Sequence, residues 1–336
     1  MRSGSSHLRS GGERSLRIIQ NPVAIRSVVV LCGGVGAARF LSGLCGVMDP
    51  SAITAIVNVG DDVTFHGLHV SPDIDTVLYT LAGLIDTEHG WGIGGDTYRT
   101  QAALARLGRE TWFQLGDADL ATHIHRTARL REGAPLSAVT EELRSRLGVG
   151  PTIIPATDDA LRTMIRTDEG WLAFQEYFVR GGTRATVRDV RFDGTARAAP
   201  GCLEAIAAAD AVLIAPSNPI VSIAPVLAVE GLREAIASAP APVIAVSPIV
   251  GGEAIKGPAA AMLTSLGHEV SPVGISRIYR DLIDVMVLDE RDAALAPAIA
   301  ALGIHPVITQ TIMADRAAKE ALARTVLDAA LANASA

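Results

Sequence analysis

The chain has 336 residues, 49% hydrophobic and 19% charged, which is enough for one large α/β unit or two joined lobes with an ample core. Its formal charge of −7, with 29 Lys and Arg against 36 Asp and Glu, argues against nucleic-acid binding through a basic patch. Three widely spaced cysteines, Cys32, Cys45 and Cys202, form no C-x-x-C pair and argue against a disulfide framework or a structural zinc site.

The first 26 residues are rich in Ser, Gly and Arg and contain no apolar core of a signal peptide. This composition predicts a disordered leader or an upstream start. After it, Pro, Asp or Gly interrupts every apolar run well short of about 18 residues, so we expect no membrane-spanning helix and no membrane partner. These features together predict a soluble protein of the cytoplasm.

Six β-branched segments have the pattern of strands, and Ala- and Leu-rich helical stretches lie between several of them. This alternation predicts an α/β fold with a mostly parallel sheet covered on both faces. Most of the segments run into Gly, Pro, Ser, Asn or Asp, where open α/β sheets place their ligands. The strands are expected at Val28–Leu31, Thr54–Val59, Ala211–Ala215, Val243–Val246, Asp284–Leu288 and Pro306–Thr309.

The middle of the chain has a different pattern. Residues 75–150 show only helical periodicity, which predicts a helical insert in a sheet domain made of residues 27–74 and 151–331. Apolar and polar residues alternate over 171–193 around Gly181-Gly182, which predicts a small antiparallel β-hairpin. Helices of the insert are expected at Thr76–Ile85, Asp96–Leu107, Asp117–Arg131 and Ser137–Leu147.

A cluster of glycines, Gly33, Gly34 and Gly36, follows the first strand directly. Glycines let a backbone approach a phosphate, and the next helix offers free N–H groups and the positive end of its dipole. The turn lacks the third glycine of a dinucleotide fingerprint and the Gly-Lys-Ser/Thr of a P-loop, so tight strand–helix packing is the alternative. Arg39 in the first helical turn is placed to grip a phosphate in two places, or to form a surface ion pair.

Carboxylates follow the second strand. Asn58 ends the strand and is followed by Asp61 and Asp62. Beside a phosphate site, such a doublet favours Mg²⁺, which bridges carboxylates to substrate phosphates; a solvated turn is the alternative. Asp73 and Asp75 come next, just before a helix. One of them is expected to cap that helix, and the other is then free for a ligand.

Two further turns lie at the ends of neighbouring strands. Ser217 and Asn218 follow the third strand, and Ser247 and Gly251 follow the fourth, with Lys256 just beyond. Their side chains have either local turn bonds or ligand contacts. Because two such turns fall at adjacent strand ends, we interpret them as the rim of a binding site.

Histidines and aromatic residues complete the candidates. His66 and His69 stand on a predicted loop without a third soft ligand, so zinc is not expected there. Aromatic residues make up only 4% of the chain, yet several gather between the aspartates and the middle of the insert. Core packing explains most of them, and a flat heterocycle stacked there would explain the gathering. They are Phe65, Trp91, Tyr98, Trp112 and Phe113.

Taken in order, these motifs resemble the 2-phospho-L-lactate transferase family of coenzyme F-420 biosynthesis, whose actinobacterial branch transfers a phosphoenolpyruvyl unit. The resemblance runs from about Val28 to Leu331. It is carried by Gly33–Gly36, Asn58–Asp62, Ser71–Thr76, Leu115–Asp117 with Ala121–His123, Pro155–Asp159, Ala215–Pro219 and Ser247–Gly251.

The resemblance implies a Rossmann-like fold with a helical insert, dependence on Mg²⁺, and a homodimer. The enzyme would move a phospholactyl, phosphoenolpyruvyl or phosphoglyceryl unit from a GDP-linked donor to the terminal hydroxyl of the deazaflavin Fo, releasing GMP. Asp61, Asp62 and Asp75 are the implied catalytic and metal-binding residues, with Asp75 contacting Fo or completing the metal site. The implied substrate-binding residues are Gly33, Gly34, Gly36, Arg39, Asn58, Asp73, Gln114, Ser217, Asn218, Ser247 and Gly251.

At Gln114 the family often has a charged residue that contacts Fo, so the amide leaves that contact open. Two other functions fit the same residues. A NAD-dependent dehydrogenase would use Asp61 to bind the ribose hydroxyls. A non-catalytic nucleotide-binding regulator would use the glycine turn without a metal. Arg39 in place of the third glycine, and the second carboxylate beside Asp61, count against the dehydrogenase.

Overall fold

The computed structural model describes residues 25–183 and 185–334. The leader predicted for residues 1–26 therefore lies outside the described residues up to residue 24. Arg26 is described, and its backbone N–H donates to the Asp210 carboxylate at 2.9 Å. Within the described ranges, no helix combines the length and the apolar character that crossing a membrane requires.

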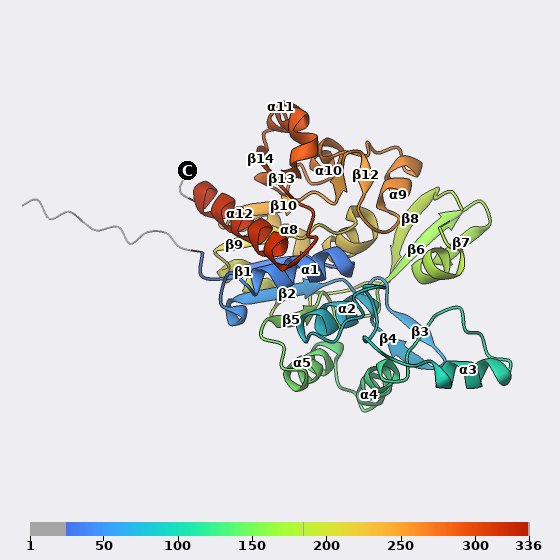
Figure 1. The fold of residues 1–336 in the computed structure, drawn as a ribbon. Coiled ribbons are helices and arrows are strands. Elements are labelled where there is room, and N and C mark those ends of the chain that lie inside the picture. The colour runs from blue at the N-terminus through green and yellow to red at the C-terminus, as the bar shows by residue number, and fades with distance from the viewer. Residues whose placement is uncertain (1–24, 184, 335–336) are drawn as a thin grey trace, which may run out of the picture.

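A seven-stranded sheet forms the centre of the molecule, and every pair of neighbouring strands in it is parallel (Figure 1). The predicted α/β fold with a mostly parallel sheet is confirmed. The six predicted strands are present, and a seventh, unpredicted strand lies at the edge. The strands are β1 (Val28–Cys32), β2 (Ile53–Val57), β5 (Thr152–Pro155), β9 (Ala211–Ile214), β10 (Val243–Val246), β13 (Val285–Asp289) and β14 (His305–Thr309).

The strand order is β14-β13-β10-β9-β1-β2-β5, so the chain builds outward from β1 in one direction and then in the other. This is the doubly wound order, whose reversal lies between β1 and β9. Every residue of β1 and β9 is buried, as expected where helices cover both faces of a parallel sheet. In such sheets the crevice at the carboxyl ends of the two central strands is the usual place for a ligand.

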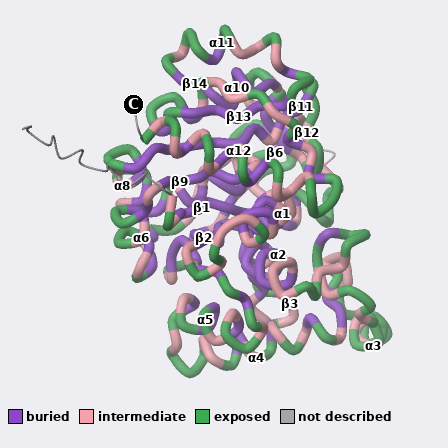
Figure 2. The backbone as a smooth tube through the Cα atoms, turned by 60° about the vertical axis from the view of Figure 1, so that its left-hand side comes forward, coloured by how far each residue is buried: buried purple, intermediate pink, exposed green. Residues whose placement is uncertain are grey.

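Helices cover both faces of this sheet (Figure 2). On one face lie α1 (Gly34–Leu44), α2 (Pro72–Leu81) and α12 (Arg316–Ala334), and on the other lie α6 (Cys202–Ala208) and α8 (Leu232–Ala237). The first helix of the predicted insert, α2, packs on α1 and contributes its buried face to the main core. Four further α-helices outside the insert in the described residues are α7 (Ala224–Leu227), α9 (Ala259–Ser265), α10 (Pro272–Ile278) and α11 (Ala296–Ala300).

The rest of the insert contains α3 (Arg99–Arg106), α4 (Asp119–Arg131) and α5 (Leu136–Arg146). Two aspartates that were expected to begin their own helices cap each other's instead. Asp96 accepts hydrogen bonds from the N–H groups of Ala118 and Asp119, at the start of α4. Asp117 accepts from the N–H groups of Arg99 and Thr100, at the start of α3. This exchange ties the two helix starts together, so both helices begin later than predicted.

A β-hairpin precedes α2 where a loop was expected. Its strands are β3 (Val63–Phe65) and β4 (Leu68–Val70). His66 and Gly67 form the turn with φ values of 52° and 77°. Positive φ at both central residues is typical of the tight turns whose twist matches paired strands.

The hairpin predicted over 171–193 is wrong in its pairing. β7 (Gly170–Ala173) and β8 (Asp189–Asp193) both pair with β6 (Arg162–Thr167), which was not predicted, and not with each other. Between them, residues Glu176–Arg180 form a π-helical turn. Phe174, Tyr177 and Phe178 are spaced for a helix, which is why the alternation failed there. A further two-stranded pair joins β11 (Ile249–Val250) and β12 (Glu253–Ala254).

Candidate functional site

A cavity of about 900 Å³ opens where β1, β9 and β10 end. Its wall combines the turn before α1, the start of α2, the insert and the segment after β7. The predicted site residues that line it are Gly33, Gly34, Gly36, Arg39, Asp61, Asp73, Asp75, Gln114, Ser217, Asn218 and Ser247. Three other predicted residues, Asn58, Asp62 and Gly251, are not part of its lining.

The glycine turn is shaped largely by close packing. A Cβ on Gly36 would lie 2.4 Å from the carbonyl oxygen of Pro216, so this glycine permits the contact between α1 and the turn after β9. A Cβ on Gly33 would lie 2.5 Å from Asp73 Oδ2. Gly34 has a φ of 76°, which favours glycine, and a Cβ on it would lie 3.9 Å from Asp73 Oδ1, an ordinary van der Waals contact. A carboxylate therefore faces the turn that was expected to face a phosphate.

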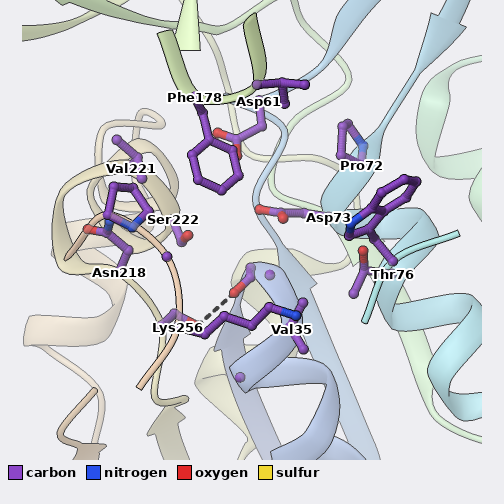
Figure 3. A pocket seen from close by; sticks show the side chains of 18 of the residues that line it. Val35, Asp61, Pro72, Asp73, Thr76, Phe178, Asn218, Val221, Ser222 and Lys256 are labelled. Carbon is purple, nitrogen blue, oxygen red and sulfur yellow. Dashed lines mark hydrogen bonds between the residues drawn. The ribbon is translucent and has the colours of Figure 1, made fainter. Parts of the chain in front are cut away.

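Asn58 holds the two carboxylates that point into the cavity. Its side chain is fully buried, and Nδ2 donates to Asp73 Oδ2 at 2.8 Å and to Asp61 Oδ1 at 3.2 Å. Its Oδ1 accepts from the N–H of Gly60 at 2.8 Å, which fixes the amide orientation. Figure 3 shows the side chains of Asp61 and Asp73 directed toward the same space, with Phe178 beside Asp61.

The charged forms of Asp61 and Asp73 are disfavoured in this setting. Burial raises the pKa of Asp73 to about 6, with a further contribution from the charge of Asp62. Burial also raises the pKa of Asp61 well above its ordinary value, and the charge of Asp73 adds to the effect. Within the described residues, no Lys or Arg forms an ion pair with either carboxylate. A bound cation would relieve both burial and repulsion, so the pair fits a divalent ion.

Asp62 points into the protein. Its Oδ2 accepts from Ser71 Oγ and pairs with His69 Nε2, both at 2.8 Å. Its Oδ1 is buried and has no hydrogen-bond partner in the described part of the chain. Ser71 precedes α2, so Asp62 ties the end of β2 to the start of that helix.

Asp75 lines the cavity, but both of its carboxylate oxygens accept from Arg126 of α4, one of them at 3.1 Å. Arg126 is completely buried and also contacts His123 Nδ1 at 3.3 Å. Asp119 accepts from Tyr79 Oη at 2.7 Å and lies 3.2 Å from His123 Nε2. These contacts fasten α4 to α2. Across residues 25–183 and 185–334, no cluster of three or more His, Cys, Asp or Glu side chains is arranged for a metal.

The polar side chains of the rim make local bonds. Ser217 Oγ donates to the carbonyl of Gly33 at 2.9 Å, and Ser247 Oγ donates to the carbonyl of Ile249 at 2.9 Å. Asn218 Oδ1 accepts from the N–H of Ile220 at 2.9 Å. Gly251, with a φ of 60°, donates its N–H to Asp292 outside the cavity. These local bonds fix the rim side chains in place. Ser217, Asn218 and Ser247 still border the cavity, whereas Gly251 does not.

The opposite end of the cavity is apolar. Trp112, Phe113 and Leu115 line it from the insert, and Phe174 and Phe178 line it from the segment after β7. Phe174 and Phe178 stack with ring centres 5.4 Å apart. The structure therefore divides the gathered aromatics: Trp91, Trp112 and Phe113 border the cavity, Phe65 is buried behind them, and Tyr98 lies outside the lining. Phe178 was not predicted, because it was assigned to a strand.

The doubly wound sheet, the cavity at its switch point and the buried carboxylates define a Rossmann-like α/β protein with a cavity in the crevice where this fold usually binds its ligands. Residues 28–331 match the family described as 2-phospho-L-lactate transferase CofD. The chain belongs to this family, and it is a transferase of coenzyme F-420 biosynthesis.

Individual relatives agree with the family. The chain is 44% identical over 309 residues to a phosphoenolpyruvate transferase of Kitasatospora aureofaciens, covering 89% of this chain and 96% of the relative. It is 38% identical over 288 residues to a 2-phospho-L-lactate transferase of Methanococcoides burtonii, covering 85% and 94%. The crystal structure of protein BH3568 from Bacillus halodurans shares the fold, with a TM-score of 0.61, 17% identity, and coverage of 90% of this chain and 99% of that one.

Proposed function

We propose that the protein transfers a phosphorylated three-carbon acid unit from a GDP-linked donor to the terminal hydroxyl of Fo and releases GMP. The observation that carries this proposal is the division of one cavity into a polar end and an aromatic end. The polar end lies at the sheet switch point, where nucleotides bind in this fold. The aromatic end offers the flat surfaces on which a tricyclic ring stacks.

We further propose that Mg²⁺ binds between Asp61 and Asp73. The sequence favoured Asp61, Asp62 and Asp75, but Asp62 and Asp75 make hydrogen bonds to protein groups instead. Asp61 and Asp73 are the buried pair that faces the cavity without a cationic partner in the described residues. When bound, Mg²⁺ would supply positive charge to the phosphate oxygens of the donor. Magnesium ions in proteins are commonly held by one or two carboxylates together with substrate phosphates.

The chain's own residues then have separable tasks. Asn58 holds Asp61 and Asp73 at a fixed separation by donating to both. The aromatic end positions the acceptor, and the rim after β9 and β10 positions the nucleoside. Displacement at a phosphate asks mainly for in-line placement and neutralised charge, so rigid placement accounts for most of the rate. The apolar lining of the aromatic end also disfavours water, which would otherwise compete with the acceptor hydroxyl.

Nucleotide binding tests this proposal against the two alternatives. We expect calorimetry to show that GDP binds more tightly with Mg²⁺ than without it, and that Asp73→Asn removes the difference. Asp49→Asn is the matched control, since Asp49 caps the short helical turn that precedes β2 and is not in the cavity lining. Binding of NAD in place of GDP would favour the dehydrogenase. A GDP affinity that is the same with and without Mg²⁺ would favour the non-catalytic regulator.

The product identifies the transferred unit. Incubation with Fo and each candidate donor, followed by mass spectrometry, separates phospholactyl, phosphoenolpyruvyl and phosphoglyceryl products by their masses. Release of one GMP for each product formed is expected. Failure to form product with all three donors would contradict the proposal. The homodimer implied by the resemblance belongs to the same proposal, and sedimentation of the purified protein tests it.

A further inference from the structure

Two cationic side chains border the cavity. Among the described residues, Arg39 and Lys256 are the Lys and Arg side chains in its lining. Arg39 lies on α1, and Lys256 follows β12, in the segment that continues from the rim at Ser247. The two cations therefore reach the cavity from α1 and from the segment after β12.

Neither cation is neutralised by a carboxylate within the described chain. Arg39 has no hydrogen bond or ion pair to any described residue, whereas ten other arginines form ion pairs there. Lys256 donates to the backbone carbonyl of His89, which uses one of its three N–H groups. In a chain with more acidic than basic residues, two unpaired cations in one cavity wall point to an anionic ligand.

Their geometry brings the two charges together over the first turns of α1. A Cβ on Gly90 would lie 2.7 Å from Lys256 Nζ and 3.2 Å from a methyl carbon of Val35, so the ammonium lies beside Val35. Figure 3 shows Lys256 reaching across α1 next to Val35, with Asp73 above them and Asp61 farther up in the view. Val35 and Arg39 are four residues apart and share a helix face. The positive charge of Arg39 also lowers the pKa of Lys256, after the effect of burial.

We infer that Arg39 and Lys256 form an anion subsite for the phosphate that stays with the nucleoside when the three-carbon unit is transferred. This inference rests on the proposed function and assigns a separate place to each phosphate of the donor. The phosphate that is attacked lies toward Asp61 and Asp73 and the aromatic end. The phosphate that departs lies against the two cations.

The reaction explains why cations are needed at this place. The acceptor hydroxyl oxygen forms a bond to the phosphorus that carries the three-carbon acid, and the bond from that phosphorus to the bridging oxygen breaks. The bridging oxygen keeps the electron pair and leaves with GMP, whose phosphate gains one negative charge, while the hydroxyl proton passes to water or a carboxylate. A guanidinium and an ammonium stabilise charge that develops on a departing phosphate.

The test compares GMP with guanosine, because the two ligands differ only in the phosphate. Calorimetry is run without Mg²⁺ on the wild type, Arg39→Met, Lys256→Met and Lys319→Met. Lys319 of α12 is the matched control, since burial and then the charge of Arg39 lower its pKa as they do for Lys256, but it does not line the cavity. We expect GMP to bind the wild type more tightly than guanosine does. We define the ratio as the affinity for GMP divided by the affinity for guanosine. Arg39→Met and Lys256→Met should each lower this ratio by about tenfold, the scale of one charged hydrogen bond.

Guanosine affinity should stay within about twofold in all variants, and Lys319→Met should keep the wild-type ratio. In turnover, Lys256→Met should lower kcat more than it raises KM, and Lys256→Arg should restore part of kcat. An unchanged ratio in both Arg39→Met and Lys256→Met would overturn this inference and leave the proposed function standing. An equal loss of guanosine and GMP binding would also overturn it, since that indicates a structural role. A wild type that binds neither ligand would overturn the proposed function, and this inference with it.

Discussion

The end of β2 and the start of α2 both carry a pair of aspartates, and both pairs divide their work in the same way. Asp61 and Asp73 face the cavity and share Asn58. Asp62 and Asp75 are engaged by protein groups, Ser71 and His69 for the former and Arg126 for the latter. Position in a motif therefore does not decide what an aspartate does. Its partners decide whether it is left to bind a ligand or holds the fold.

The largest effect should come from Arg126, which neutralises Asp75, one of the two carboxylates engaged by protein groups. Arg126→Met removes the guanidinium that pairs with the buried Asp75 and leaves the His123 ring, with Nδ1 at 3.7 Å, beside that carboxylate. Breaking a buried ion pair in this way costs about 3–5 kcal/mol. Chemical denaturation should show this loss in the free energy of unfolding. Asp75→Asn combined with Arg126→Met should recover part of it. If Arg126→Met unfolds like the wild type, Asp75 is not held by this pair and the comparison fails.

The cavity-facing pair should matter most for turnover. Asp61→Asn and Asp73→Asn each keep the hydrogen bond from Asn58 but remove a charge that would hold the cation. We expect kcat/KM to fall about 10²–10³-fold, as for loss of one group that stabilises transition-state charge. Steady-state kinetics at saturating Mg²⁺ measures this, with circular dichroism to confirm the fold. Turnover close to that of the wild type in both variants would remove Asp61 and Asp73 from the reaction.

Asp62 sharpens the comparison because it is adjacent in sequence to Asp61. Asp62→Asn perturbs the contacts with Ser71 and His69 and leaves both cavity carboxylates in place. We expect a loss of about 10–100-fold in kcat/KM, typical of a residue that supports metal-binding groups from behind. Kinetics as a function of Mg²⁺ concentration would detect it. A loss as large as that of Asp61→Asn would place Asp62 among the ligands instead.

Much of the fold was predictable because its signals are local. β-Branched runs at Val28, Ala211 and Val243 are completely buried strands, and such runs have few other interpretations. The capping of α3 and α4 was not predictable, because Asp96 and Asp117 sit at equally good starting positions for their own helices. The choice between the two arrangements depends on how the helices meet in space. The strand β6 was missed for a related reason, since it gains its partners from segments on both sides of a π-helical turn.

The candidate site was predictable as a set of residues but not as an arrangement. The motifs that follow the predicted strands contain many of the residues that line the cavity. They come together because the carboxyl ends of parallel strands lie at the same edge of the sheet. No sequence signal pairs Asp75 with Arg126, 51 residues later, or places Asn58 between Asp61 and Asp73. Lys256 stood out only as a residue just beyond the rim. Its contact with His89, 167 residues earlier, depends on the closed fold.

The smallest effect we expect is on stability as a function of pH, and it distinguishes the two kinds of aspartate without any substrate. The pKa of Asp73 is raised from 3.8 to about 6 in the folded protein, so the folded state binds this proton more tightly than the unfolded state does. The stability that this group contributes is present below pH 4 and is lost as the pH rises through 6. In metal-free buffer, Asp73→Asn should therefore gain Tm relative to the wild type between pH 4.5 and pH 7 by a few degrees.

Mg²⁺ should reduce this gain, because a cation stabilises the charged pair only in the wild type. Asp49→Asn serves as the control, since Asp49 is exposed and its pKa is lowered by hydrogen bonds from Ser51. Differential scanning calorimetry over this pH range, with and without the cation, measures both effects. If the Tm of the wild type and of Asp73→Asn depends on pH in the same way, the charged form of Asp73 is not destabilised by burial. The argument that the two cavity carboxylates are suited to a metal ion would then fail.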